Sequence, residues 1–369
     1  MNNGARVTPS SAPAVSSPQA GSAIPAGPIP FVRLSAGRLA WAALALLAVF
    51  VVLTNANDVP GILSALRHAD PFYLLAAAAF QAVFIVNLAF FYKSAFAVLG
   101  LEAPLGRFTL LGAGGYFVNL VSKTSGLGGM ALYLNEGSSR GFKRGRTVTA
   151  YMITVILGHI AFFVTLSLAF ALLYTSGRLR PAELAAAGVT TALLLAVLAV
   201  LAYIATDRRR LEAASGFVHR LGRRVRRLAG SPPDANGDSA EDLPGDLYEA
   251  VNDLRREPAR YARPMAHALL VEILGVAVLF ASARALGADI SIAGAIAVYA
   301  VSVLFSMVSI TPSGLGFVEA SVTGFLVSLG VPLHHAVAAS LAYRFFEFWV
   351  PLLIGALAVR TLTRQRATR

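Results

Sequence analysis

The 369-residue chain contains no cysteine and has few charged side chains. Without cysteine it forms no disulfide, no thiolate nucleophile and no zinc site with sulfur ligands. Charged residues make up 14% of the chain and hydrophobic residues 56%, whereas an average soluble domain has about 25% charged residues. This composition predicts a protein with several membrane-spanning helices.

Acidic residues are scarcer than basic ones, 19 against 31, and the formal net charge is +12. In a soluble protein this excess would suggest a nucleic-acid partner. Here the arginines lie beside apolar runs, as the positive-inside bias of membrane proteins predicts. We therefore expect no nucleic-acid partner, and a multi-pass protein of the plasma (inner) membrane with both termini in the cytoplasm.

Several functional signatures are missing as well. The six histidines are scattered, and no pair of carboxylates has the company of further metal ligands, so neither metal nor hydrolytic chemistry is predicted. The chain has no P-loop and no dinucleotide fingerprint, and no cofactor is expected. Residues 1–30 have no apolar core and hence no cleavable signal sequence; residues 1–34 are predicted to be a disordered tail.

Six apolar runs are predicted to cross the membrane: 39–53, 71–99, 148–174, 182–205, 265–286 and 336–359. They divide the membrane domain into a first half, 35–206, and a second half, 265–362. Between the halves, residues 207–264 contain eight arginines from Arg208 to Arg227, followed by an acidic stretch. We interpret this segment as a basic amphipathic helix on anionic cytoplasmic lipid and a flexible linker. The alternative is that the arginines of this segment only set the orientation of the neighbouring spans. At the end of the chain, residues 363–369 are predicted to form a basic tail.

The apolar stretch 306–330 is interrupted at what should be membrane depth by Pro312, Gly314, Gly316 and Glu319. Because lipid offers backbone groups no hydrogen-bond partners, such a break must lie within protein or beside a water-filled cavity. Residues 317–329 would span only about 20 Å as a helix, too little for a hydrocarbon core of about 30 Å. The stretch predicts a re-entrant helical hairpin over residues 291–330.

An imperfect copy of this stretch occurs earlier, where 121–128 aligns with 308–316 with one gap. It predicts a second hairpin over residues 106–140. Three full spans separate the two hairpins, so the second is inverted relative to the first. The predicted fold is an all-α polytopic membrane protein with six full spans and two re-entrant hairpins in an inverted-topology repeat.

The two hairpin tips are the candidate binding site. Ser-Gly pairs at 125–126 and 313–314 are expected to open half-helices whose free N–H groups bind an anion such as phosphate; the alternative is that they only cap helices. In the membrane, Glu319 is predicted to pair with Arg344, and Arg344 with Glu347 is the alternative. The candidate substrate-binding residues are Asn119, Ser122, Lys123, Thr124, Ser125, Gly126, Gly128, Ser309, Thr311, Pro312, Ser313, Gly314, Gly316, Glu319 and Arg344.

The motif TPSGLGFVE at 311–319, followed by Gly330 and a helix with Arg344, resembles the signature of the lysylphosphatidylglycerol synthase transmembrane family. Asn119 and the Gly-Gly pair at 128–129 resemble the upstream motif of that family, and the resemblance covers residues 36–360. Lys123 and Met130 stand where the family often has proline and an acidic residue. These departures indicate an altered or asymmetric first site.

The resemblance implies that the chain moves phospholipid or other lipid-linked head groups between leaflets. Full-length members add a soluble domain that aminoacylates lipid from charged tRNA, and we expect none here. The first hypothesis is therefore a flippase-like translocator with anionic membrane lipids as partners, and not an enzyme. The others are a membrane-embedded transferase with Glu319 as general base, or a non-catalytic partner of a cytoplasmic lipid-modifying enzyme docked on residues 207–264.

Overall fold

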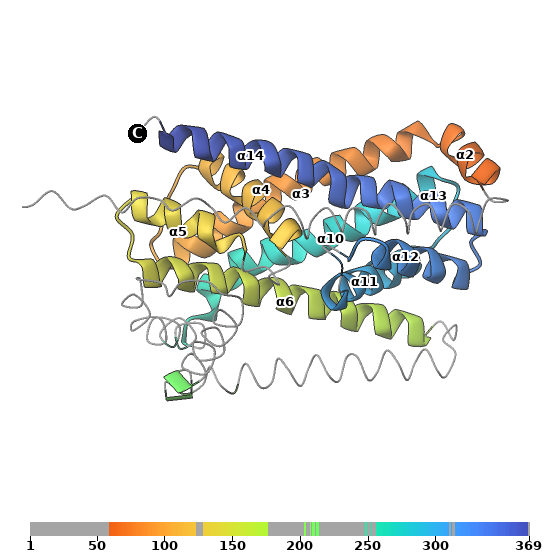
Figure 1. Cartoon of the computed structure of the whole chain (residues 1–369). Helices are drawn as coiled ribbons and strands as arrows, with labels where there is room; N and C mark the ends of the chain where they lie inside the picture. The colour runs from red at the N-terminus through yellow and green to blue at the C-terminus, as the bar shows by residue number, and fades with distance from the viewer. Residues whose placement is uncertain are drawn as a thin grey trace, which may run out of the picture. The chain divides into compact units, whose positions relative to one another are not determined.

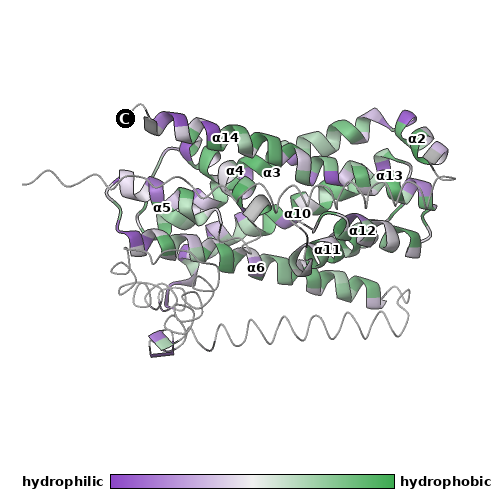
Figure 2. Cartoon of the chain, viewed as in Figure 1, coloured by the Kyte–Doolittle hydropathy of each residue, from purple (hydrophilic) through white to green (hydrophobic). Residues whose placement is uncertain are grey.

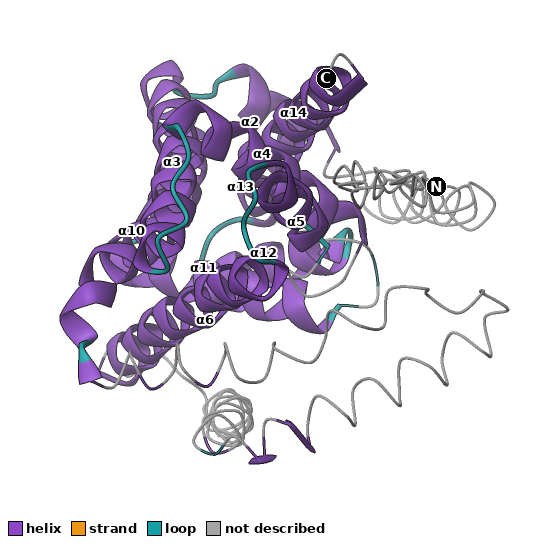
Figure 3. Ribbon diagram, turned by 90° about the vertical axis from the view of Figure 1, so that its left-hand side faces the viewer, coloured by secondary structure: helices purple, strands orange, loops and turns teal. Residues whose placement is uncertain are grey.

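The computed structural model describes residues 59–122, 128–175, 256–309, 311 and 314–367, with a few isolated residues between 203 and 252. The described residues form helices and loops without a strand (Figure 3), which confirms the all-α prediction. The predicted tail 1–34, the apolar run 39–53, the run 182–205 apart from Tyr203, and most of segment 207–264 lie outside the described residues.

Four described helices are long and apolar enough to cross a membrane, and most of their length is green in Figure 2. They are α3 (Pro71–Val98), α6 (Arg144–Thr175), α10 (Ala262–Ala285) with the preceding 3₁₀ turn η3 (Pro258–Tyr261), and the last span. The last span runs through α13 (Leu333–Arg344), η5 (Phe345–Trp349) and α14 (Val350–Ala367). These helices confirm four of the predicted runs.

The ends of these helices follow from local chemistry. At the start of α3, the Asp70 side chain accepts a hydrogen bond of 2.8 Å from the Phe72 N–H, and Pro71 takes the first helical position. Helix α6 begins at Arg144, four residues before the predicted run. Arginine is a good helix former, so the helix can begin before its apolar stretch. The prediction from the sequence covered only the apolar part of the helix.

Two features of the helices were not predicted. Helix α2 (Val59–Arg67) follows the first predicted span and packs against α13. The last span contains a π-helical turn, η5, directly after Arg344. Such turns are rare within α-helices and frequent at functional sites.

Two pairs of shorter helices lie in the regions where the hairpins were predicted. Helix α4 (Leu105–Ser122) packs against α5 (Met130–Ser139), and α11 (Ile292–Val308) packs against α12 (Phe317–Ser328) (Figure 1). With 10 and 12 residues, α5 and α12 are about 15 and 18 Å long, too short to cross a bilayer core of about 30 Å.

The two halves of the described membrane domain contact each other through several helix pairs. Helix α10 packs along α3, α11 along α6, and α14 along α4 of the first hairpin. The α14–α4 contact is close because Gly355 has no side chain: a Cβ there would lie 2.4 Å from the Phe117 Cβ and 2.5 Å from the Ala113 oxygen. Small residues commonly allow such approaches between membrane helices.

Candidate functional site

The tip of the α11–α12 hairpin is a tight glycine-containing turn. Gly314 and Gly316 have φ angles of 69° and 85°, in the left-handed region that glycine adopts readily. A Cβ on Gly314 would lie 2.6 Å from the Val318 Cγ2 and 3.1 Å from the Ser306 Cα. The absence of a side chain on Gly314 therefore lets the turn pack directly against Ser306 of α11 and Val318 of α12.

The described hydroxyl groups of this tip bond to one another and to the backbone. The Ser309 and Thr311 hydroxyls are 2.9 Å apart, the Thr311 N–H donates to the Ser309 Oγ, and the Thr311 hydroxyl donates to the Leu315 oxygen at 2.8 Å. These contacts stabilise the turn. Among the other predicted site residues, Lys123, Thr124, Ser125, Gly126, Pro312 and Ser313 lie outside the described residues.

The Ser-Gly pairs do not open the two half-helices as expected, although the run 317–329 gave the start of α12 correctly. Helix α12 begins at Phe317 rather than at the Ser-Gly pair 313–314, and α5 begins at Met130 rather than at 125–126. The reason in α12 is a capping arrangement: the Glu319 Oε2 accepts a hydrogen bond of 2.7 Å from the N–H of the N-cap residue Gly316. The chain's own carboxylate thus binds at the helix start where a phosphate was expected.

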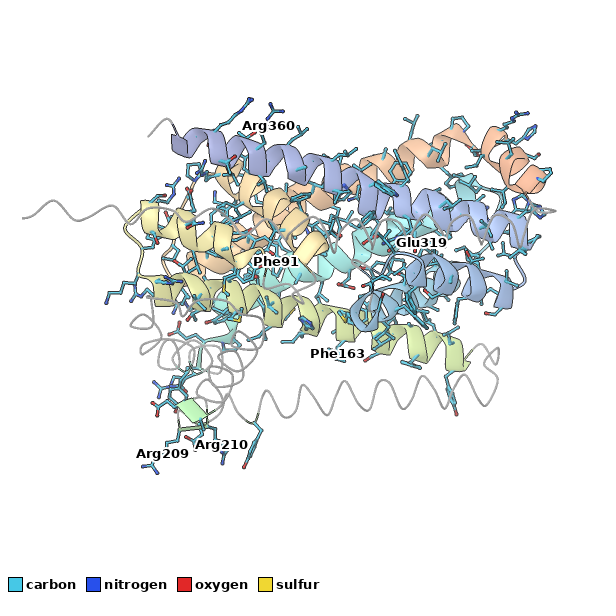
Figure 4. All side chains as sticks on the ribbon, in the orientation of Figure 1. Phe91, Phe163, Arg209, Arg210, Glu319 and Arg360 are labelled. Carbon is cyan, nitrogen blue, oxygen red and sulfur yellow. The ribbon has the colours of Figure 1, made fainter. Side chains whose placement is uncertain are left out.

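Glu319 also belongs to an ionic network centred on Arg344. The Arg344 Nε donates to the Glu319 Oε1 at 2.9 Å, and its Nη1 donates to the Glu347 Oε2 at 2.6 Å. The two predicted pairings, considered as alternatives, therefore exist together. The Arg344 side chain is 3% exposed, whereas those of Glu319 and Glu347 are 24% and 29% exposed. Figure 4 shows Glu319 within the helical assembly.

The network connects three parts of the membrane domain. Glu319 lies on α12, Arg344 ends α13, and Glu347 lies in the π-helical turn. The Tyr116 hydroxyl of α4 approaches the Glu347 Oε1 at 3.4 Å, and the Arg344 guanidinium lies 4.8 Å from the Phe348 ring centroid. One cation thus holds two carboxylates, one of which is linked to the first hairpin.

The first hairpin has a neutral counterpart of the Glu319 contact. The Asn119 Oδ1 accepts a hydrogen bond of 2.6 Å from the N–H of Gly129, the N-cap of α5, and its Nδ2 donates to the Tyr151 hydroxyl of α6 at 3.3 Å. In both hairpins, a side chain binds the N-cap glycine and also bonds to the next long helix. Ser122 ends α4, and Gly128 lies in the turn before α5.

A second ionic cluster, which the sequence reasoning missed, lies at the other end of the first hairpin. Glu136 of α5 binds Arg107 of α4 at 2.6 Å and Arg140 at 2.8 Å, and Arg107 also bonds to Gln365 of α14. Burial would raise the pKa of Glu136, but the hydrogen bonds and charges of both arginines hold this pKa below its ordinary value. Only the i,i+4 spacing of Glu136 and Arg140 was visible in the sequence.

Comparison with known proteins agrees with the motif resemblance. The family model described as lysylphosphatidylglycerol synthase TM region matches residues 40–355. No curated protein matches the chain. Among the described residues, no group of three or more His, Asp or Glu could hold a metal ion. The chain is thus a multi-pass membrane protein that belongs to the lysylphosphatidylglycerol synthase transmembrane-region family.

Proposed function

We propose that the protein is a flippase-like lipid translocator that moves a phosphate-bearing lipid, or a lipid-linked head group, between leaflets. The observation that carries this proposal is the Arg344 network: a buried guanidinium beside a broken helix, at the depth of apolar spans. Ionisable groups inside a membrane are costly and usually serve a function. A guanidinium binds two phosphate oxygens at once, just as it binds the two oxygens of a carboxylate. The phosphate of an arriving head group can therefore replace Glu347 or Glu319 as the partner of Arg344.

The proposed architecture has six full spans and two re-entrant hairpins in an inverted repeat. The short returning helices α5 and α12 support it, because neither is long enough to cross the bilayer. The aligned tip sequences 121–128 and 308–316 also support a repeat; Asn119 and Glu319 make similar contacts from opposite limbs of their hairpins and are not equivalent positions. The substrate would lie between the tips, against the predicted site residues, with anionic lipids as its source.

The transferase hypothesis is less favoured by the geometry around Glu319. Both of its carboxylate oxygens accept hydrogen bonds, one from the Gly316 N–H and one from Arg344. With both oxygens already accepting hydrogen bonds, this carboxylate has no free oxygen pointed at a substrate proton, as a general base requires. The third hypothesis is that a lipid-modifying enzyme docks on residues 207–264. Most of these residues lie outside the described ones, and this hypothesis stays a proposal.

The topology can be tested directly because the chain has no cysteine. In the proposed orientation, with both termini in the cytoplasm of the inner membrane, the start of α3 faces outward and the start of α6 inward. A single cysteine replacing the exposed His68 should react with an impermeant thiol reagent in intact cells, and one replacing the exposed Lys143 only after lysis. Labelling of both positions from one side would contradict the arrangement.

Lipid movement is tested with purified protein in liposomes that contain a fluorescent phospholipid. A membrane-impermeant reductant bleaches the phospholipid in the outer leaflet, and the measured quantity is the rate at which the remaining fluorescence is lost. This rate should be higher in liposomes with the wild-type protein than in protein-free liposomes. The double variant Glu319→Gln, Arg344→Gln should fold but lose about tenfold to a hundredfold in rate, since hydrogen bonds to charged groups contribute about 1.5–3 kcal/mol.

The matched control for this assay is Gly158→Ala in α6, where an added Cβ has nothing within 4 Å. It should move lipid at the wild-type rate. Equal rates in wild-type and protein-free liposomes, or a fully active double variant, would refute the proposed function.

A further inference from the structure

Glu272 of α10 is a buried acid outside the Arg344 network. The residue is 8% exposed, and its Oε2 has no hydrogen-bond partner. Among the described residues, no ionisable side chain of α3 or α6, the long helices on which α10 packs, forms a hydrogen bond or ion pair with it. An ionised carboxylate without a counter-ion is costly in such surroundings, whereas a protonated acid carries no charge to neutralise.

Tyr299 of α11 fits against α10 beside this acid. A Cβ on Gly275, three residues after Glu272, would lie 2.5 Å from the Tyr299 Cε2 and 2.6 Å from its hydroxyl oxygen. The missing side chain of Gly275 therefore admits the phenol to the α10 surface, within one helical turn of Glu272. Tyr299 is itself buried, at 6% exposure, so the α10–α11 interface encloses an acid and a phenol together.

A second tyrosine extends this polar cluster toward the Arg344 network. Glu272 acts electrostatically on both Tyr299 and Tyr343 of α13. The Tyr343 hydroxyl lies 3.4 Å from the Ser302 Oγ of α11, and Glu347 and Arg344 act on the same tyrosine. The titratable groups facing Glu272 are thus Tyr299 from α11 and Tyr343 from α13, with Glu347 of η5 beyond them.

We propose that Glu272 is a proton-binding site whose occupancy is coupled to the head-group site at Arg344. One proton from water adds to the carboxylate and gives the neutral acid, and its release to water restores the carboxylate. A phosphate bound at Arg344 adds negative charge to the same cluster and therefore favours the neutral form of Glu272, because like charges repel strongly in a low-dielectric interior. By reciprocity, a proton bound at Glu272 strengthens the binding of the head group at Arg344. The coupling, though not the proton site, rests on the proposed function and would supply its energy source.

The proton site is tested without any lipid movement, by infrared titration of the purified protein in nanodiscs. The carbonyl stretch of a protonated carboxylic acid should appear in the wild type, decrease as the pH rises, and be absent from Glu272→Gln. Ser282→Ala is the matched control on the same helix, because it removes a buried hydroxyl that has no partner; it should keep the band. An unchanged band in Glu272→Gln overturns the proposal.

If Glu272→Gln does not fold, Tyr299→Phe decides the question. This variant keeps the ring against Gly275 and removes only the hydroxyl beside the carboxyl. A shifted midpoint of the infrared titration supports the proton site, and an unshifted one overturns it.

Coupling is tested in liposomes with an imposed pH gradient. One pH unit should change the steady-state distribution of the fluorescent phospholipid by up to about tenfold per coupled proton in the wild type and in Ser282→Ala. The distribution in Glu272→Gln should not respond to the gradient; an equal response there overturns the coupling. A wild type with a titrating band but no lipid movement would refute the proposed function while the proton site stands.

Discussion

Replacing Arg344 by glutamine should lower the free energy of unfolding by about 3–5 kcal/mol, as expected when one partner of a buried ion pair is removed. Arg344 is 3% exposed and binds both Glu319 and Glu347. The substitution leaves two carboxylates close together without their cation, and they then repel each other in a medium of low dielectric constant. The loss should appear as a lower unfolding midpoint of the detergent-solubilised protein and as a lower yield of monodisperse material.

Two further variants separate charge from shape at this position. Arg344→Lys keeps the charge but lacks the planar fork that binds two carboxylates at once, so it should recover only part of the stability. The double variant Glu319→Gln, Arg344→Gln removes one of the two stranded carboxylates and should be more stable than Arg344→Gln alone. Wild-type stability in Arg344→Gln would show that the network does not hold α12 against the last span.

Replacing Gly355 by alanine should destabilise the protein by about 1–3 kcal/mol, the usual range for overpacking a close-packed interior. The added Cβ would lie 2.4 Å from the Phe117 Cβ and 2.5 Å from the Ala113 oxygen. A backbone oxygen cannot rotate away, so α14 and α4 must separate. Since this contact joins the last span to the first hairpin, thermal unfolding followed by tryptophan fluorescence or size-exclusion chromatography should register the change.

The control is again Gly158→Ala in α6, whose new Cβ meets nothing within 4 Å. Alanine favours helix over glycine by about 1 kcal/mol, so this variant should be unchanged or slightly more stable. Equal unfolding midpoints for Gly355→Ala and Gly158→Ala would contradict the close packing of α14 on α4.

Local signals in the sequence were sufficient to place most described elements. Helix α3 ends one residue before the end of the predicted run, and α12 covers 317–328 where 317–329 was expected. Both are predominantly apolar runs that end two residues before a glycine, Gly100 after α3 and Gly330 after α12. The family likewise followed from one short motif and was confirmed over residues 40–355.

The start of α5 was not predictable in this way. It depends on Asn119, ten residues earlier, whose side chain binds the N–H of Gly129 while it also bonds to Tyr151 of the next helix. A capping group supplied from another helix leaves no mark in the local sequence. The same holds for Arg107 and Glu136, 29 residues apart, which only the packing of α4 on α5 brings together.

By itself, the sequence determined the membrane class, the four described long helices and the two pairs of shorter helices, because these depend on apolar length and on glycine or proline at single positions. Only the tertiary structure decided which groups meet: that Arg344 holds Glu319 and Glu347 at once, and that Tyr116, 231 residues from Glu347, reaches the same network. Hydrogen bonds and ion pairs act over a few ångströms, and the distance along the chain does not determine which residues come that close. That proximity is set by how the helices pack.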